Sequence, residues 1–141
     1  GVDVIVGFPG ETEELFQETY NLLNELDVSY LHVFTYSERE NTEALNIKDP
    51  VSPKIRKYRS KVLRNLSEKK KLAFYKKNIG LVKNVLFENK NEDGYVFGFS
   101  ENYIKIKSKY NEELTNSIKK VEISQIAYDK NTYAEGNLIE N

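Results

Sequence analysis

The feature that most constrains the fold is a β-branched run at residues 2–6 that ends in a Gly-Phe-Pro-Gly turn at residues 7–10. A nearly continuous apolar run of this kind is typical of a buried parallel strand. Thr12 can cap a helix that begins with two glutamates and carries apolar residues at helical spacing as far as Leu26. A second strand is expected at residues 28–36, so the segment predicts one βαβ unit. Because one unit leaves its strand edges unpaired, we expect companion strands or self-association through those edges.

A long basic helix is expected after a polar loop. Ser52 and Pro53 suit the cap and the first position of a helix that continues to Lys77. Residues 54–77 carry 11 basic and one acidic side chain, whereas residues 1–53 carry 11 acidic and two basic ones. Three interpretations stay open, namely phosphate contact, a solvated face, and packing against the acidic segment. The expected apolar stripe of this helix consists of Ile55, Tyr58, Val62, Leu66 and Ala73.

The remainder of the chain changes to short alternating runs separated by polar turns. Strands are expected at residues 81–87, 95–100, 103–107, 119–128 and 138–139. Four or five short strands in about 60 residues predict a small antiparallel barrel.

Composition excludes several kinds of chemistry. The sequence has no Cys and a single His, His32, so its residues cannot build a disulfide, a thiolate cluster or most nucleophilic triads. His32 lies mid-strand and is expected to be structural. We predict no catalytic residue and no metal ligand. No apolar run approaches the ~18 residues that span a bilayer, and no secretory leader is evident, so we expect a cytoplasmic protein without a membrane partner.

Three motifs resemble one protein family. Residues 3–12, DVIVGFPGET, resemble the fifth-strand motif of the radical S-adenosylmethionine (SAM) methylthiotransferases. Residues 31–39, LHVFTYSER, resemble the sixth strand and exit loop, in the form most similar to the MtaB branch, which modifies threonylcarbamoyladenosine beside the tRNA anticodon. Residues 94–105, GYVFGFSENYIK, resemble a TRAM domain, a small RNA-binding barrel. At residues 40–44 the chain has ENTEA where the family commonly has Pro-Gly-Thr-Pro-Ala, so the loop has lost its restraints.

The resemblance implies three segments. Residues 1–53 would be an α/β remnant, the last βαβ unit of a partial TIM-like barrel. Residues 54–77 would be a connecting helix, and residues 78–141 a TRAM-like, OB-like all-β antiparallel barrel. The family implies SAM and two 4Fe-4S clusters in a parent enzyme whose N-terminal part holds the cluster cysteines. We therefore expect this chain alone to hold no cofactor and to be inactive.

The same resemblance implies two sets of binding residues. The residues expected to line the adenosyl side of SAM are Ile5, Val6, Gly7, Phe8 and Tyr36. A core tyrosine with its hydroxyl at the rim is an equal alternative for Tyr36, and Glu11 either contacts ligand or begins the helix. The residues expected to bind RNA are Phe99, Tyr103, Lys105, Lys107 and Lys109, whose partner would be a tRNA anticodon stem-loop. The alternating lysines share one strand face, which a half-buried strand would show equally.

Two other functions remain open at this stage. One is a stand-alone RNA-binding module without catalysis, and the other is part of a methylthiotransferase that acts on a ribosomal protein. Because the sequence opens with Gly1 and a strand almost at once, we expect it to be part of a larger protein.

Overall fold

The computed structural model describes residues 1–128 and 131–140, and the chain divides into two units, 1–71 and 72–141. The division falls within the helix α2 (Pro53–Lys77), which therefore contributes residues to both units. Within the described ranges, no helix is long and apolar enough to cross a membrane.

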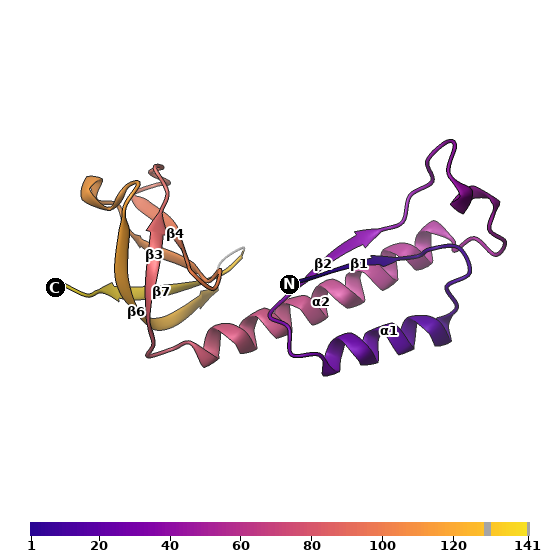
Figure 1. Cartoon of the computed structure of the whole chain (residues 1–141), viewed down its shortest axis with the longest axis horizontal. Coiled ribbons are helices and arrows are strands. Elements are labelled where there is room, and N and C mark those ends of the chain that lie inside the picture. The colour runs from indigo at the N-terminus through magenta and orange to yellow at the C-terminus, as the bar shows by residue number, and fades with distance from the viewer. Residues whose placement is uncertain (129–130, 141) are drawn as a thin grey trace. The chain divides into compact units, whose positions relative to one another are not determined.

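The first unit is the predicted βαβ arrangement followed by most of α2 (Figure 1). Strand β1 (Val2–Val6) pairs in parallel with β2 (Leu31–Thr35), and helix α1 (Glu13–Glu25) connects them. The Thr12 hydroxyl accepts a hydrogen bond from the Leu15 amide at 3.2 Å, which confirms the predicted cap. Strand β2 is shorter than the predicted 28–36. A short helix, η1 (Glu43–Asn46), lies in the predicted loop.

One face of this two-stranded sheet packs on both helices. Alternate residues of β1 and β2 point toward α1 and α2, and the core they form consists of Val6, Phe16, Leu23, Leu31, Leu63 and Leu66. The opposite face carries Ile5 and Phe34, which pair across the strands and are 57% and 52% exposed. The first unit is therefore covered on one side only.

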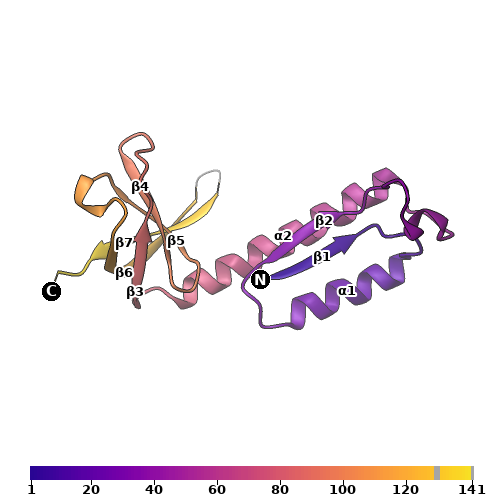
Figure 2. The ribbon, with the colours of Figure 1, turned by 45° about the horizontal axis from the view of Figure 1, so that its top comes forward.

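The second unit is a closed five-stranded barrel with the strand order β3-β4-β5-β7-β6 (Figure 2). The strands are β3 (Val82–Phe87), β4 (Tyr95–Ser100), β5 (Lys105–Lys109), β6 (Ile118–Tyr128) and β7 (Thr132–Leu138), with the short helix η2 (Glu112–Leu114) before β6. The prediction of a wholly antiparallel barrel is wrong in one respect, because β5 pairs with β7 in parallel. Strand directions cannot alternate all the way round a ring with an odd number of strands, so one parallel pair is required.

Two strand predictions need correction. Strand β5 begins at Lys105 rather than at Tyr103, because Tyr103 has a φ of 65° and turns the chain between β4 and β5. Strand β7 covers residues 132–138 rather than 138–139. Its sequence, TYAEGNL, has few apolar residues, and it is held in place by β5 and β6 on its two sides.

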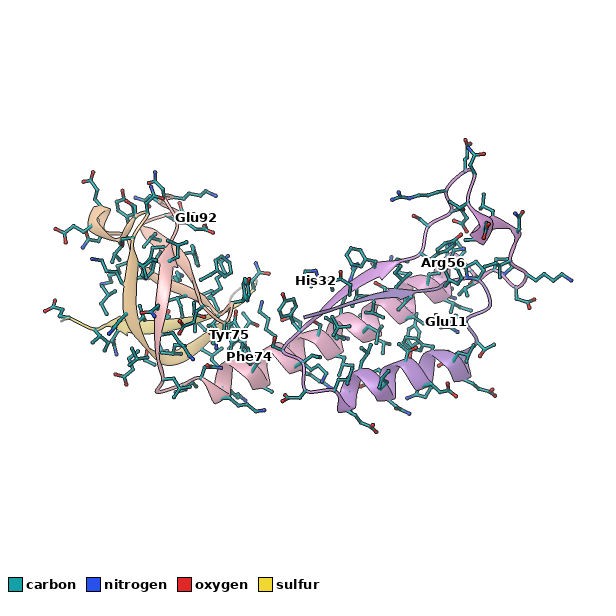
Figure 3. The ribbon with its side chains drawn as sticks, viewed as in Figure 1. Glu11, His32, Arg56, Phe74, Tyr75 and Glu92 are labelled. Atoms are coloured by element: carbon teal, nitrogen blue, oxygen red, sulfur yellow. The ribbon has the colours of Figure 1, made fainter. Side chains whose placement is uncertain are left out.

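The last turns of α2 close one end of the barrel. Tyr75 is 3% exposed among the core residues of the barrel, and its hydroxyl accepts a hydrogen bond from the Lys105 amide at 3.0 Å (Figure 3). Asn78 accepts another from the Asn102 side chain at 3.0 Å. The helix end is therefore part of the barrel fold.

Ser67 ties β2 to α2 in the first unit. Its buried hydroxyl accepts a hydrogen bond from the Leu31 amide at 2.8 Å and donates one to the Leu31 carbonyl at 3.0 Å. Both backbone groups of Leu31 therefore depend on this side chain.

The substitution Ser67→Ala should lower the free energy of unfolding of the first unit by about 1–3 kcal/mol, because it buries the Leu31 amide without an acceptor. Urea unfolding followed by circular dichroism measures the change. The control Ser37→Ala removes an exposed hydroxyl and should change stability by no more than about 0.5 kcal/mol. Equal stability of the two variants would contradict the role given to Ser67.

Candidate functional site

The turn after β1 is held by its own backbone and by Glu11. The Glu11 carboxylate accepts a hydrogen bond from the Gly7 amide at 2.9 Å. Gly7 has a φ of 79°, and a Cβ at this position would lie 2.4 Å from Cγ of Arg56. Glycine is therefore required here by its backbone conformation and by the close approach of α2. Glu11 stabilises the turn through this hydrogen bond and precedes α1, which begins at Glu13.

Arg56 lies against the turn after β1 and binds the loop after β2 (Figure 3). Its side chain is 8% exposed, and it donates hydrogen bonds to the carbonyls of Val51 at 2.7 Å and Tyr36 at 3.2 Å. It also binds both carboxylate oxygens of Glu38, with Nη1 at 3.1 Å from Oε2. This hydrogen-bonded pair lowers the pKa of Glu38 from 4.5 to about 2 and raises the pKa of Arg56.

Arg59 makes the matching connection to the beginning of α1. Its Nη1 donates hydrogen bonds to the Glu11 carbonyl at 2.8 Å and to the Glu11 carboxylate at 2.9 Å, and its Nη2 lies 3.4 Å from the Glu13 carboxylate. The guanidinium also lies 5.4 Å from the centre of the Phe16 ring. Both arginines are buried, so they act within the fold and are not open to a phosphate.

The predicted apolar stripe of α2 is wrong at both ends, since Ala73 near its C-terminal end is exposed while Tyr75 is buried. Ile55 and Tyr58 are exposed, whereas Arg56, Arg59 and Ser60 are buried. Because arginine is charged, a pattern based on hydropathy did not identify the face of α2 that carries Arg56 and Arg59 as buried. A signal was present, since Glu11 and Glu38 lie in the loops that follow the two strands and are acidic groups with which arginines pair.

The predicted SAM-facing residues lie on or beside the end of β1. Ile5 points to the open face of the sheet, Phe8 is 43% exposed, and the Gly7 amide is taken by Glu11. The Val6 side chain is fully buried toward the helices, so only its backbone can face a ligand. The Val6 carbonyl already accepts a hydrogen bond from the Tyr36 amide at 2.8 Å.

Tyr36 packs between Phe8 and Arg56. The Phe8 and Tyr36 rings meet edge to face at 5.4 Å, and the Arg56 guanidinium lies 5.3 Å from the centre of the Tyr36 ring. The Tyr36 hydroxyl is buried and has no hydrogen-bond partner among the described residues.

His32 lies on the open face of the sheet, 3.7 Å from the Asp3 carboxylate (Figure 3).

The five predicted RNA-binding residues lie on or beside one outward surface of β4 and β5. Phe99 pairs with Lys105 across the two strands, while Ile104 and Ile106 point into the core, as the alternation predicts. The Lys105 ammonium lies 4.6 Å from the centre of the Phe97 ring, and the Lys107 ammonium lies 4.1 Å from that of Tyr95. Two of the three lysines therefore cover aromatic rings as well as carrying charge.

Phe99 and Tyr103 offer the open aromatic rings of this surface. Tyr103 is 74% exposed, and both rings line a hollow of about 820 Å³ together with Leu86 and Ile118. Leu86 pairs with Phe99 on one side and with Ile118 on the other, which makes an apolar row across three strands. Leu86 and Ile118 are not among the residues predicted from the sequence. A signal for Leu86 was present in the sequence. It is an apolar residue on the outward side of a strand whose inward residues are Val85 and Phe87, which is typical of a contact surface.

A scan against protein-family models finds no match. Among curated proteins, the chain is 38% identical to the threonylcarbamoyladenosine tRNA methylthiotransferase MtaB of Bacillus subtilis over 97% of the chain and 31% of that protein. It is 44% identical to the MtaB of Aquifex aeolicus over 76% of the chain and 25% of that protein. It is also 35% identical to the tRNA-2-methylthio-N(6)-dimethylallyladenosine synthase of Sulfurimonas denitrificans over 88% of the chain and 28% of that protein. The chain thus spans about a quarter to a third of the length of these relatives.

Replacing Glu38 with Gln should weaken the dependence of stability on pH. The folded pKa of Glu38, about 2, lies below its ordinary value of 4.5. The contribution of the Arg56 pair is therefore complete above pH 4.5 and is lost as the pH falls toward 2. In urea unfolding between about pH 7 and pH 2.5, the variant should lose less stability than the wild type. Glu40→Gln, which removes an exposed carboxylate without an ion pair in the described ranges, should behave like the wild type; the same loss in all three proteins would exclude the pair as a cause.

Proposed function

We propose that this chain, a relative of the MtaB tRNA methylthiotransferases, forms the C-terminal part of an enzyme that adds a methylthio group to threonylcarbamoyladenosine in tRNA. The similarity to the Bacillus subtilis protein carries the proposal, because it covers 97% of the chain and so includes both the turn after β1 and the barrel. The relatives described above act, by their names, on modified tRNA adenosines, which favours tRNA over a ribosomal-protein substrate. The cytoplasm is the compartment proposed for this activity.

In this proposal the first unit supplies one wall of a SAM site. The open face of the β1–β2 sheet presents Ile5 and Phe34, and Phe8 stands at the end of β1. Ligands of parallel α/β folds bind at the carboxyl ends of the strands, where these residues lie. Apolar side chains and a tight glycine turn fit the adenosyl part of SAM, which would supply both the radical and the methyl group when bound.

The remaining walls are proposed to come from other strands of the same enzyme. The β1–β2 sheet has only two strands, and its exposed apolar face favours a partner. The outer face of α1 adds Leu15 and Leu22, which are 49% and 58% exposed. Two 4Fe-4S clusters would be held by cysteines outside these residues, since the sequence has none.

The gene itself tests the enzymatic half of the proposal. Reading upstream of the codon for Gly1 should reveal further parallel-strand sequence and a Cys-xxx-Cys-xx-Cys run for one cluster. A start codon at Gly1 would instead favour the stand-alone RNA-binding module.

In the second unit, we propose that the barrel binds the tRNA anticodon stem-loop through Phe99, Tyr103, Lys105, Lys107 and Lys109. The open rings of Phe99 and Tyr103 suit stacking by unpaired bases, and the neighbouring lysines suit the phosphate backbone. The left-handed backbone of Tyr103 supports this role. A bulky residue with positive φ is strained, and here it directs a 74% exposed ring outward.

The substitution Tyr103→Ala should weaken binding of an anticodon stem-loop RNA about 5- to 150-fold, which corresponds to the ~1–3 kcal/mol of one base stacked on an aromatic ring. Fluorescence anisotropy with labelled RNA measures the dissociation constant. Tyr128→Ala removes a 63% exposed tyrosine outside the proposed surface and serves as the matched control. Unchanged affinity in Tyr103→Ala, or an equal loss in the control, would refute the stacking role.

A further inference from the structure

A hollow in the first unit lies between the end of β2 and the first half of α2. Its volume is about 570 Å³, and six of the residues that line it carry the argument: Tyr36, Arg56, Lys57, Ser60, Lys61 and Arg64. The four α2 residues from Lys57 to Arg64 in this set follow the spacing i, i+3, i+4 and i+7, so they form one stripe along the helix. This stripe is separate from the barrel surface and from the open face of the sheet.

The charge of the hollow is not neutralised within the described residues. Arg56 is paired with Glu38, but Lys57, Lys61 and Arg64 form no ion pair in residues 1–128 and 131–140. These three side chains are exposed, so their charges are available to a partner. Three cations along a stripe of about two helical turns can neutralise phosphates of a nucleic-acid backbone.

Two buried hydroxyl groups at the same hollow lack hydrogen-bond partners. Ser60 is 4% exposed, and neither its Oγ nor the Tyr36 hydroxyl finds a donor or an acceptor within the described part of the chain. A buried hydroxyl without a partner costs free energy, so each such group in a native protein needs an explanation. Each hydroxyl can donate a hydrogen bond to an anionic oxygen, and Lys57, Lys61 and Arg64 of the same lining supply positive charge beside it.

We infer that this hollow is a phosphate-binding subsite for the backbone of the bound RNA, formed by Lys57, Ser60, Lys61 and Arg64. The inference rests on the proposed RNA binding and adds a contact outside the barrel. The unpaired cations attract the phosphate, and the buried hydroxyls can donate hydrogen bonds to it. A lysine face that serves only as a solvated surface would have no buried hydroxyls without partners. Arg56, whose charge Glu38 already satisfies, shapes the wall of the hollow.

The test compares two variants that change the net charge equally. Lys61→Glu with Arg64→Glu alters the hollow, whereas Lys54→Glu with Lys69→Glu alters exposed lysines of the same helix outside it. With labelled anticodon stem-loop RNA, the first variant should bind at least about tenfold more weakly, and its plot of log affinity against log salt should be shallower by about 1–2. The control should stay within about twofold of the wild type. Equal losses in the two variants, or no loss in the first, would overturn the subsite. Lys61→Gln with Arg64→Gln repeats the test if charge reversal disturbs folding.

Inorganic pyrophosphate probes the hollow without RNA. In nuclear magnetic resonance spectra of the whole chain, its addition should shift the amide signals of residues 57–65, and the Lys61→Glu, Arg64→Glu variant should not show these shifts. Shifts that are absent or spread along all basic residues would overturn the subsite even if the barrel binds RNA. If the wild type shows the local shifts but binds no stem-loop RNA, the subsite stands as an anion site, and both the proposed RNA binding and the assignment of RNA as its ligand fail.

Discussion

Two buried arginines hold together the end of the first unit where the proposed ligand site lies. Arg56 reaches Val51 in the loop before α2 and the residues that follow β2, while Arg59 reaches the turn that leads into α1. A guanidinium can bind carbonyls and a carboxylate at once because its donors lie in one plane. Removing a carboxylate partner would leave a buried guanidinium with less compensation, which costs more than losing a surface ion pair.

The arrangement also explains why glycine follows β1. The Arg56 side chain passes so close to Gly7 that a Cβ there would collide with it. Glycine at residue 7 is therefore required both by the backbone conformation of the turn and by the close packing of α2. The turn is already shaped within this unit, and the Gly7 amide is bound by Glu11, so its form does not require a ligand.

The two units differ in how completely they bury their own surfaces. The barrel closes on itself and leaves no strand edge among its five members, and the end of α2 covers part of its core. The first unit has two strands, one covered face and exposed apolar residues on the other. This contrast agrees with the proposal that the first unit completes a larger α/β sheet and that the barrel binds RNA.

The sequence by itself determined most of the elements and their order. Periodicity and caps located β1, α1, α2 and β4 closely, because these segments bury a regular apolar pattern or begin at a recognisable cap. Their motifs also pointed to the family before any contact was known. The tertiary structure alone decided which face of α2 is buried, since Arg56 and Arg59 become core residues only when Glu38 and Glu11 meet them from distant loops. It likewise decided the parallel β5–β7 pair, the apolar row of Leu86, Phe99 and Ile118, and the hollow beside Ser60. Each of these features depends on residues far apart in the chain. The local sequence pattern contains no information about which distant group will pair with a charge, which strand will pair with an edge, or what will lie beside a hydroxyl.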